Sequence, residues 1–191
     1  MADISYNPDS KLITPDESRE TLDIYVAQAN ALTQALIAEN NPNFTPQPSA
    51  DSTKLIKNLF ESGVKNIKQN KLPEALKNVS LAVEMAQRKR APWEAFAIQL
   101  QELQFMLRHK IDLELMLGRY LDALQDLDML LSTGLFQPEV FIRKTDALLH
   151  LGQLEEARVS CDRGLCLQPQ NVKLKAMMME CDRKLADYNG L

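Results

Sequence analysis

The chain has 191 residues, 45% of them hydrophobic and 25% charged, and its formal net charge is −4. This length fits one compact helical domain with an appendage. The sequence lacks the run of roughly 18 apolar residues that a membrane span needs. It also lacks the basic start and apolar run of a signal peptide. We therefore expect no direct membrane span, and residence in the cytosol.

The charge is unevenly distributed along the chain. Residues 1–53 carry two basic and eight acidic side chains, residues 54–90 carry nine and three, and residues 91–191 carry eleven and fifteen. A basic block between two acidic segments attracts acidic peptides or anionic surfaces. The alternative is an ordinary solvated helix face, which composition alone favours.

Catalytic and metal-binding patterns are absent from the sequence. It contains no Gly-rich phosphate loop, no Gly-x-Ser-x-Gly elbow and no His-Glu-x-x-His motif. His109 and His150 lie on separate predicted helices, and the three cysteines lack zinc-ligand spacing. We expect a protein that is not an enzyme and that has no cofactor, metal or nucleic-acid partner.

The first dozen residues have the pattern of a short β-hairpin. Residues 4–6 and 11–13 flank the segment Asn7-Pro8-Asp9-Ser10, whose residues suit a type I turn. A hairpin this short is not stable alone, so it needs something to lie against.

A helix is predicted next, with Thr14 as its cap and Pro15 at its first position. The helix has one apolar face at helical spacing, made of Leu22, Tyr25, Val26, Ala29, Leu32 and Leu36. The helix is expected to stop near Asn40. Three prolines then predict a stiff extended linker: Pro42, Pro46 and Pro48.

Three later segments share one pattern: residues 70–75 (NKLPEA), 118–123 (GRYLDA) and 152–157 (GQLEEA). The first residue, Asn or Gly, tolerates a left-handed backbone at a tight turn. The large apolar third residue fills the gap between two helices, and the final Ala lets those helices approach closely. The second and third segments are 34 residues apart, which is the tetratricopeptide period.

The first and second segments are 48 residues apart, so about 14 residues are inserted between them. Pro92 and an apolar spacing that runs from Trp93 through Phe96 to Leu117 predict a longer first helix in the second repeat, extended by about three turns. A last helix, from Val172 to Tyr188, has the position of a solenoid cap.

These patterns predict an all-α fold, a tetratricopeptide-repeat superhelix of three helix-turn-helix repeats with a C-terminal capping helix, preceded by a small hairpin-plus-helix module. The expected domains are residues 1–50, the module with its Pro-rich linker, and residues 51–191, the repeats. The first helices of such repeats line a concave groove that binds peptides. Their groove positions are Lys57, Phe60, Val64 and Lys68, then Arg108, His109 and Asp112, then Glu139, Ile142, Arg143 and Asp146.

Two resemblances follow from particular segments. Residues 141–148 (FIRKTDAL) resemble the last repeat of carboxylate-clamp domains, which hold the acidic C-terminal tail of Hsp70 or Hsp90 chaperones. Residues 41–48 (NPNFTPQP), 75–86 (ALKNVSLAVEMA) and 87–100 (QRKRAPWEAFAIQL) resemble the fungal tetratricopeptide-repeat subunit of the post-translational protein-translocation (Sec) complex of the endoplasmic reticulum. The second resemblance covers nearly the whole chain, including the linker and the insertion.

This resemblance implies a peripheral subunit on the cytosolic face of the endoplasmic reticulum membrane. A small membrane-anchored partner subunit would hold it there, in a complex with a J-domain membrane subunit and the translocation channel. Its groove would dock the C-terminal tail of cytosolic Hsp70 and so bring precursor proteins to the channel. The competing hypothesis is a structural scaffold subunit with no chaperone-binding role.

The clamp of the resembled family does not transfer whole. Its Lys and Asn in the first repeat are replaced by Phe60 and Val64, its second-repeat Asn by His109, and its third-repeat Lys by Glu139. The retained Arg143, with His109 and Lys68 or Lys57, would hold the terminal carboxylate, because a guanidinium offers a planar fork of donors. Phe60, Ile142 and Asp146 would line the site. Two lost lysines predict weaker binding or a shifted pose; otherwise Arg143 forms a surface salt bridge and His109 is an ordinary exposed residue.

The N-terminal module suits docking to the membrane-anchored subunit. Its candidate docking residues are Ile4, Tyr6, Leu12, Ile13, Leu22 and Tyr25. The alternative is packing against the chain's own repeats. The run Arg88-Lys89-Arg90 either solvates the turn before Pro92 or faces an acidic partner or lipid head groups.

Overall fold

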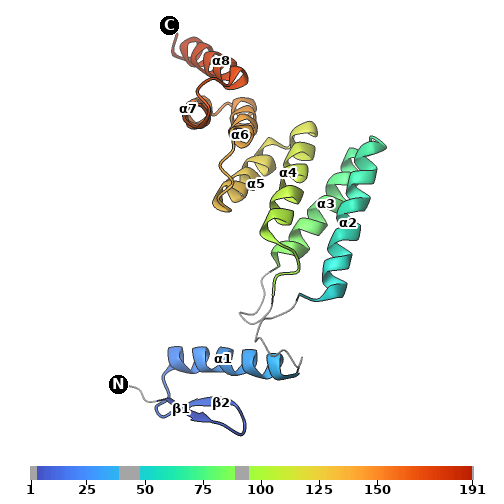
Figure 1. Cartoon of the computed structure of the whole chain (residues 1–191). Coiled ribbons are helices and arrows are strands. Elements are labelled where there is room, and N and C mark those ends of the chain that lie inside the picture. Colours follow the sequence, from blue (N-terminus) through green and yellow to red (C-terminus); the bar gives the residue numbers. More distant parts are fainter. Residues whose placement is uncertain (1–3, 39–47, 89–94, 191) are drawn as a thin grey trace. The chain divides into compact units, whose positions relative to one another are not determined.

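The computed structural model describes residues 4–38, 48–88 and 95–190 (Figure 1). A two-stranded hairpin of β1 (Ile4–Asn7) and β2 (Leu12–Pro15) comes first in the chain. The helices that follow are α1 (Glu20–Ala38), α2 (Ala50–Lys68), α3 (Leu72–Gln87), α4 (Leu100–Met116), α5 (Tyr120–Ser132), α6 (Pro138–His150), α7 (Leu154–Leu167) and α8 (Val172–Asn189). In those three ranges, none of the helices has both the length and the apolar composition of a membrane crossing.

The chain divides into two compact units by its internal contacts. One unit comprises residues 1–56 and 85–98, and the other comprises residues 57–84 and 99–191. The first contains the hairpin, α1 and the start of α2. The second contains the remaining turns of α2, most of α3 and all of α4 to α8, and it carries the helix pairs of a tetratricopeptide-repeat fold.

A hairpin is present as expected, but Asn7 ends β1 and Lys11 lies in the turn with φ of 59°, so the predicted turn at residues 7–10 is shifted by one residue. The following helix begins later than the sequence predicted. Thr14 and Pro15 belong to β2, where they pair with Ser5 and Ile4, and α1 starts only at Glu20. The predicted cap at Thr14 was therefore wrong. Its side-chain oxygen lies 2.7 Å from Ser5 Oγ across the two strands, so strand pairing takes the residue that was expected to cap the helix.

One face of α1 turns inward, with one exception. Leu36 is buried, and Leu22, Val26, Ala29 and Leu32 are half-buried, as the helical spacing predicted. Tyr25 is instead 68% exposed. Tyr25 thus shares the helical spacing of the apolar face, but its side chain remains exposed.

The three repeated segments form three equivalent turns, as predicted. Asn70, Gly118 and Gly152 all have left-handed backbone, with φ of 58°, 71° and 74°. The residue after each turn former donates its N–H to a carbonyl five residues earlier, at distances of 2.8 to 2.9 Å. This pattern satisfies carbonyls that a helix end leaves unpaired. The Ala that closes each segment is fully buried: Ala75, Ala123 and Ala157.

Neighbouring helices of the repeats approach each other closely at Gly63 and at Gly164. A Cβ on Gly63 of α2 would lie 2.5 Å from Val79 Cγ2 on α3. A Cβ on Gly164 of α7 would lie 2.9 Å from Phe141 Cβ and 2.9 Å from Leu174 Cδ1. Gly164 therefore lets α7 pack closely between α6 and α8.

The insertion between the first two repeats is not a lengthened helix. α4 begins at Leu100, and residues 95–99 are not helical, so the predicted extension through Phe96 was wrong. Pro92 and Trp93 lie outside the described residues. Ala97 is buried, and its carbonyl accepts a 2.6 Å hydrogen bond from Thr53 Oγ1. This hydrogen bond ties the segment before α4 to the start of α2.

A buried ionic cluster joins α4 to α5. The Glu114 carboxyl is 2% exposed, and Lys110 Nζ lies 3.5 Å from it and 2.6 Å from Asp126 on α5. Burial and the nearby charge of Asp126 raise the pKa of Glu114 to about 7, although Lys110 opposes the shift. The folded chain therefore binds this proton more tightly than the unfolded chain does.

We predict that Gly164→Ala destabilises the protein, although alanine is the better helix former. Helix propensity favours Ala by about 1 kcal/mol, whereas forcing an atom into a packed core costs about 1–3 kcal/mol. Urea unfolding should show a net loss of about 1 kcal/mol. The loss should shrink in a Leu174→Ala background, which removes two of the atoms that the new Cβ would meet. Unchanged stability would mean that α6 and α8 give way at no cost.

We predict that Glu114 makes stability fall as the pH rises from about 5 to 8. Its folded pKa lies above its unfolded value, so its stabilising contribution is present at low pH and is lost as the pH passes about 7. Glu114→Gln should flatten this dependence and stabilise the protein at pH 8 by about 1–3 kcal/mol. Chemical unfolding at several pH values measures the effect, and Glu155→Gln on α7 is the exposed control. A steeper slope in Glu114→Gln would contradict the prediction.

Candidate functional site

An aromatic cluster joins α2 to α4 on the groove side of the repeats. The Phe60 ring lies edge-on to Phe105 and to His109, with centroid distances of 5.7 and 5.3 Å. The Phe105 and His109 rings are 4.5 Å apart. His109 Nδ1 lies 3.0 Å from the Phe105 carbonyl oxygen, one turn earlier in α4, and this contact fixes the orientation of its ring.

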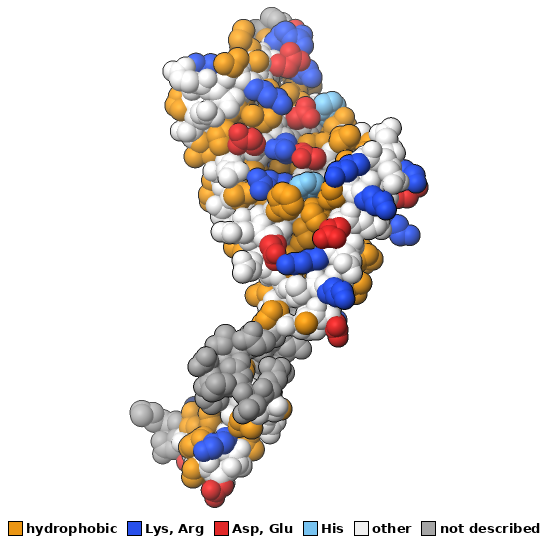
Figure 2. Space-filling view, turned by 45° about the vertical axis from the view of Figure 1, so that its right-hand side comes forward, with side chains coloured by type: hydrophobic (Ala, Val, Ile, Leu, Met, Phe, Trp, Pro, Cys, Tyr) orange, Lys and Arg blue, Asp and Glu red, His pale blue; other side chains and the backbone are white. Residues whose placement is uncertain are grey.

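The cluster forms the floor of an open cavity of about 420 Å³. Residues of α2 and α4 line it: Phe60, Glu61, Val64, Lys65, Lys68, Phe105 and His109. Among the described residues, neither Lys65 nor Lys68 has an ion-pair partner. Figure 2 shows hydrophobic and histidine side chains on a face of the repeat helices, with basic and acidic side chains interspersed among them. An apolar floor with two lysines at its rim suits an acidic peptide that carries an aliphatic side chain.

Arg143 on α6 is already paired. Its Nε lies 2.6 Å from Asp112 Oδ1 and its Nη2 lies 3.1 Å from Asp112 Oδ2, so the guanidinium and carboxylate form a two-pronged pair between α6 and α4. Nη1 also donates to the Glu139 carbonyl. Asp112 is three residues after His109, so this pair lies next to the aromatic cluster along α4. The surface salt bridge that the sequence left as an alternative for Arg143 is present.

Three further predicted groove residues, Lys57, Ile142 and Asp146, lie outside this cavity. Lys57 lies on α2 away from the cavity lining and pairs with Glu102 at 3.0 Å. The hydrogen bond from Lys57, with one from the Gln99 N–H, lowers the pKa of Glu102. Asp146 lies 3.7 Å from His150 one turn on, and Ile142 is half-buried on the same helix.

The structure thus brings Phe60, Lys68 and His109 together in one cavity, and leaves Arg143 in a neighbouring ion pair. Glu61, Lys65 and Phe105 also line the cavity and were missed by the sequence analysis. Phe105 lies four residues before His109, so helical spacing alone places it on the same face.

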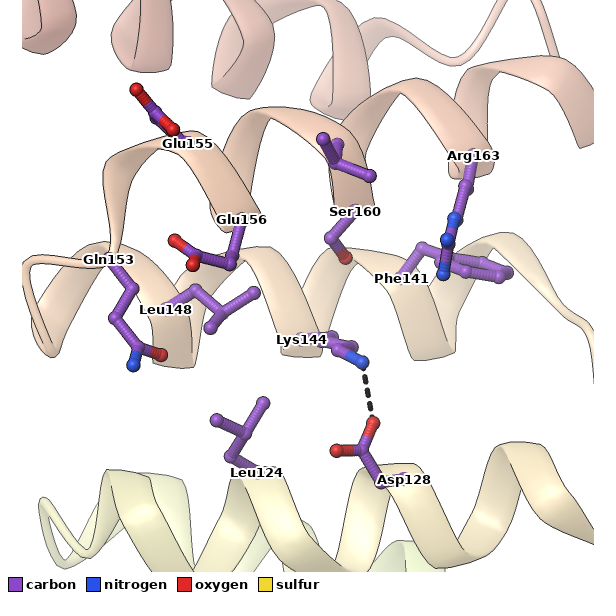
Figure 3. Close-up of a pocket in the computed structure, with 11 residues that line it drawn as sticks. Leu124, Asp128, Phe141, Lys144, Leu148, Gln153, Glu155, Glu156, Ser160 and Arg163 are labelled. Atoms are coloured by element: carbon purple, nitrogen blue, oxygen red, sulfur yellow. Dashed lines mark hydrogen bonds and ion pairs between the residues drawn. The ribbon is translucent and has the colours of Figure 1, made fainter.

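A second cavity of about 450 Å³ lies between α5, α6 and α7 (Figure 3). Figure 3 shows Lys144 reaching toward Asp128, with which it forms an ion pair. Asp128, Glu155 and Glu156 line it along with Lys144 and Arg163. Carboxylates outnumber cations here, so this cavity is a poor site for an acidic peptide.

No group of His, Cys, Asp and Glu side chains within residues 4–38, 48–88 and 95–190 is arranged to hold a metal ion. Cys161 and Cys181 are buried free thiols, and burial raises the pKa of both, that of Cys161 to about 11. Neither is a reactive thiolate at neutral pH.

Comparison with known proteins gives one close relative. No protein-family model matches the chain. It is 62% identical over 192 residues to the translocation protein SEC72 of Saccharomyces cerevisiae, and the match covers 100% of both chains. A chain of the S. cerevisiae Sec complex, solved by cryo-EM with Sec61 pore ring and Sec63 FN3 mutations, is 61% identical with a TM-score of 0.73, covering 98% of this chain and 100% of that one.

More distant structures share the fold. The first TPR domain of Spaghetti (RPAP3), bound to the HSP90 peptide SRMEEVD, is 21% identical with a TM-score of 0.55 and covers 70% of this chain and 95% of that one. The second TPR domain of human RPAP3, in complex with the HSP70 peptide SGPTIEEVD, is 16% identical with a TM-score of 0.52 and covers 69% and 95%. The chain is therefore built of repeats of the tetratricopeptide type, as the sequence predicted. It belongs to the family of the translocation protein SEC72.

Proposed function

We propose that this chain is an adaptor subunit of a Sec translocation complex, and that its groove docks the acidic C-terminal tail of cytosolic Hsp70. The observation that carries the proposal is the apolar cavity between α2 and α4, with Lys65 and Lys68 at its rim. Support also comes from the SEC72 family and from the EEVD peptides held by the two distant TPR domains. In this role the chain would bring precursor proteins to the channel.

The cavity favours a particular pose for the tail. The aliphatic side chain of an EEVD tail would lie against Phe60 and Phe105, where its burial stabilises the complex. The tail's carboxylates would lie near Lys65 and Lys68, which have no ion-pair partner among the described residues. The clamp lysine and asparagine of the first repeat correspond to Phe60 and Val64 in this chain. Apolar contact with the aromatic floor would thus take the place of their hydrogen bonds to the tail.

Arg143 would take part only in competition with Asp112. A tail carboxylate that reaches the guanidinium must displace or share a pair already made at 2.6 and 3.1 Å. This cost predicts weaker binding than a free arginine would give. The same pair is the observation that favours the alternative function, a structural scaffold in which Arg143 and Asp112 join α6 to α4 and no chaperone binds.

The N-terminal module, residues 1–50, would dock the membrane-anchored partner subunit and hold the chain on the cytosolic face of the endoplasmic reticulum. The J-domain subunit and the channel would then be indirect partners. Three of the six proposed docking residues, Ile4, Tyr6 and Tyr25, are 55%, 57% and 68% exposed. The others, Leu12, Ile13 and Leu22, are half-buried and support them from within the module.

We predict that the full chain binds the peptide SGPTIEEVD and that salt weakens the binding, because charges at the cavity rim attract it. The double substitution Lys65→Ala and Lys68→Ala should lower the affinity by about tenfold. Lys77→Ala is the matched control, because Lys77 lies on α3 outside the cavity. Isothermal titration measures each dissociation constant. Absence of binding at millimolar peptide would reject the receptor and leave the scaffold.

We predict opposite effects for the two members of the ion pair. Arg143→Ala should weaken peptide binding, whereas Asp112→Asn should strengthen it by about three- to tenfold, because it releases the guanidinium for the tail. Both side chains are partly exposed, so neither change should alter stability by more than about 1 kcal/mol. In the double variant the gain should vanish. Equal affinities in all four proteins would show that the tail does not reach Arg143.

A further inference from the structure

One edge of the hairpin is closed by a side chain of α1. Asn30 Oδ1 accepts a hydrogen bond from the Ile13 N–H, and Asn30 Nδ2 donates to the Ile13 carbonyl, both at 2.8 Å. The carboxamide thus makes both hydrogen bonds that a neighbouring strand would make with Ile13. The outer edge of β2 is occupied at this position.

The contact between Asn30 and Ile13 also shows in which direction the backbone groups of β1 point. Ile13 uses its N–H and carbonyl outward, so its pair with Tyr6 is a non-hydrogen-bonded pair of the antiparallel ladder. Pro15 pairs with Ile4 and has no N–H, which agrees with the same alternation. Tyr6 and Ile4 therefore direct their own N–H and carbonyl groups away from β2, toward the other edge of the sheet.

That other edge has no partner among the described residues, where the sheet consists of β1 and β2 alone. All four residues of β1 are exposed. The side chains of Ile4 and Tyr6, two positions apart, lie on the same face of the strand and are 55% and 57% exposed. Unpaired backbone groups beside exposed apolar side chains are the features that let another strand add to a sheet.

We propose that the outer edge of β1 is a strand-addition site, where an extended basic segment of a partner protein pairs with the backbone of Ile4 and Tyr6. This inference rests on the proposed docking role of the N-terminal module and specifies how that docking is made. The added strand would donate to and accept from Ile4 and Tyr6, completing a three-stranded sheet. Its apolar side chains would lie beside the two exposed ones.

Charge identifies the occupant as a different protein rather than a second copy. Residues 1–53 carry eight acidic and two basic side chains. One of the two cations, Arg19, is already paired with Glu17 at 3.1 Å. Edge-to-edge pairing of two copies would bring these acidic segments together, whereas a strand flanked by Lys or Arg would be attracted to them.

The test separates backbone pairing from side-chain contact. Tyr6→Pro removes the outward N–H and leaves the β1–β2 hydrogen bonds, which do not involve that group. Pro15 shows that this hairpin accepts proline at an outward-facing position. Tyr6→Val, which keeps the N–H and has high strand propensity, is the matched control. Ile4→Pro, opposite Pro15, is the second variant.

Each full-length variant is mixed with purified yeast Sec complex that lacks its own SEC72 chain.

The expected result is at least a tenfold loss of affinity for the complex in Tyr6→Pro and in Ile4→Pro, and less than a threefold change in Tyr6→Val. In the wild-type chain, hydrogen exchange at the Ile4 and Tyr6 amides should slow on assembly. Proline variants that assemble normally, or amides that exchange as fast in the complex as in the free chain, would overturn the proposal. Slowed exchange in the concentrated chain alone would assign the edge to a second copy and would also overturn it.

Peptide binding by the groove, which tests the proposed function, is measured separately on the same variants. Affinity for SGPTIEEVD depends on the groove of the other unit, so Tyr6→Pro should leave it unchanged. Loss of assembly in a double variant that replaces Tyr6 and Tyr25 by Ser, together with normal assembly of Tyr6→Pro, would keep the docking module and reject strand addition.

Discussion

Left-handed turns at Asn70, Gly118 and Gly152 are the constraint on which the repeats depend. Each turn reverses the chain within a few residues and delivers a fully buried alanine against the preceding helix. Because the three turns are equivalent, the helices before them present equivalent faces. Phe60 on α2 can therefore meet Phe105 on α4, and Asp112 on α4 can meet Arg143 on α6. The groove is a consequence of turn geometry rather than of any local signal at the site itself.

Within that groove, ion pairs decide which charges remain for a ligand. Asp112 and Glu102 engage Arg143 and Lys57, two of the cations that the sequence offered for a clamp. Partly exposed pairs of this kind contribute little to stability, yet they compete directly with a ligand carboxylate. Recognition then shifts toward the apolar floor, where burial of an aliphatic side chain does not depend on unpaired charge. In the proposed function, a site of this design would select tails that combine an aliphatic residue with several acidic ones.

Sequence reasoning succeeded where the cause is local and failed where it is distant. The three turns were predictable because each depends on a residue within a six-residue segment. The start of α4 was not, since the apolar spacing from Trp93 continues a helical pattern, whereas residues 95–99 are not helical and Ala97 contacts Thr53, 44 positions away. Likewise Arg143 was recognised as a groove residue, but its partner is 31 positions away on another helix. An ion pair between two helices produces no regular spacing in the sequence from which it could be predicted.

The hairpin is too short to be stable without a neighbouring element. Two strands of four residues are marginal in water, and α1 stabilises one edge through a single carboxamide that imitates a strand at Ile13. The alternation of the ladder then leaves the backbone groups of Ile4 and Tyr6 directed outward. A partner strand would satisfy them and so stabilise the element that recruits it, coupling docking to the ordering of the hairpin. Groove recognition needs no such coupling, because its helices are already packed through buried turns. In the proposed role, the chain would thus combine a preformed peptide site with a docking element that its partner completes.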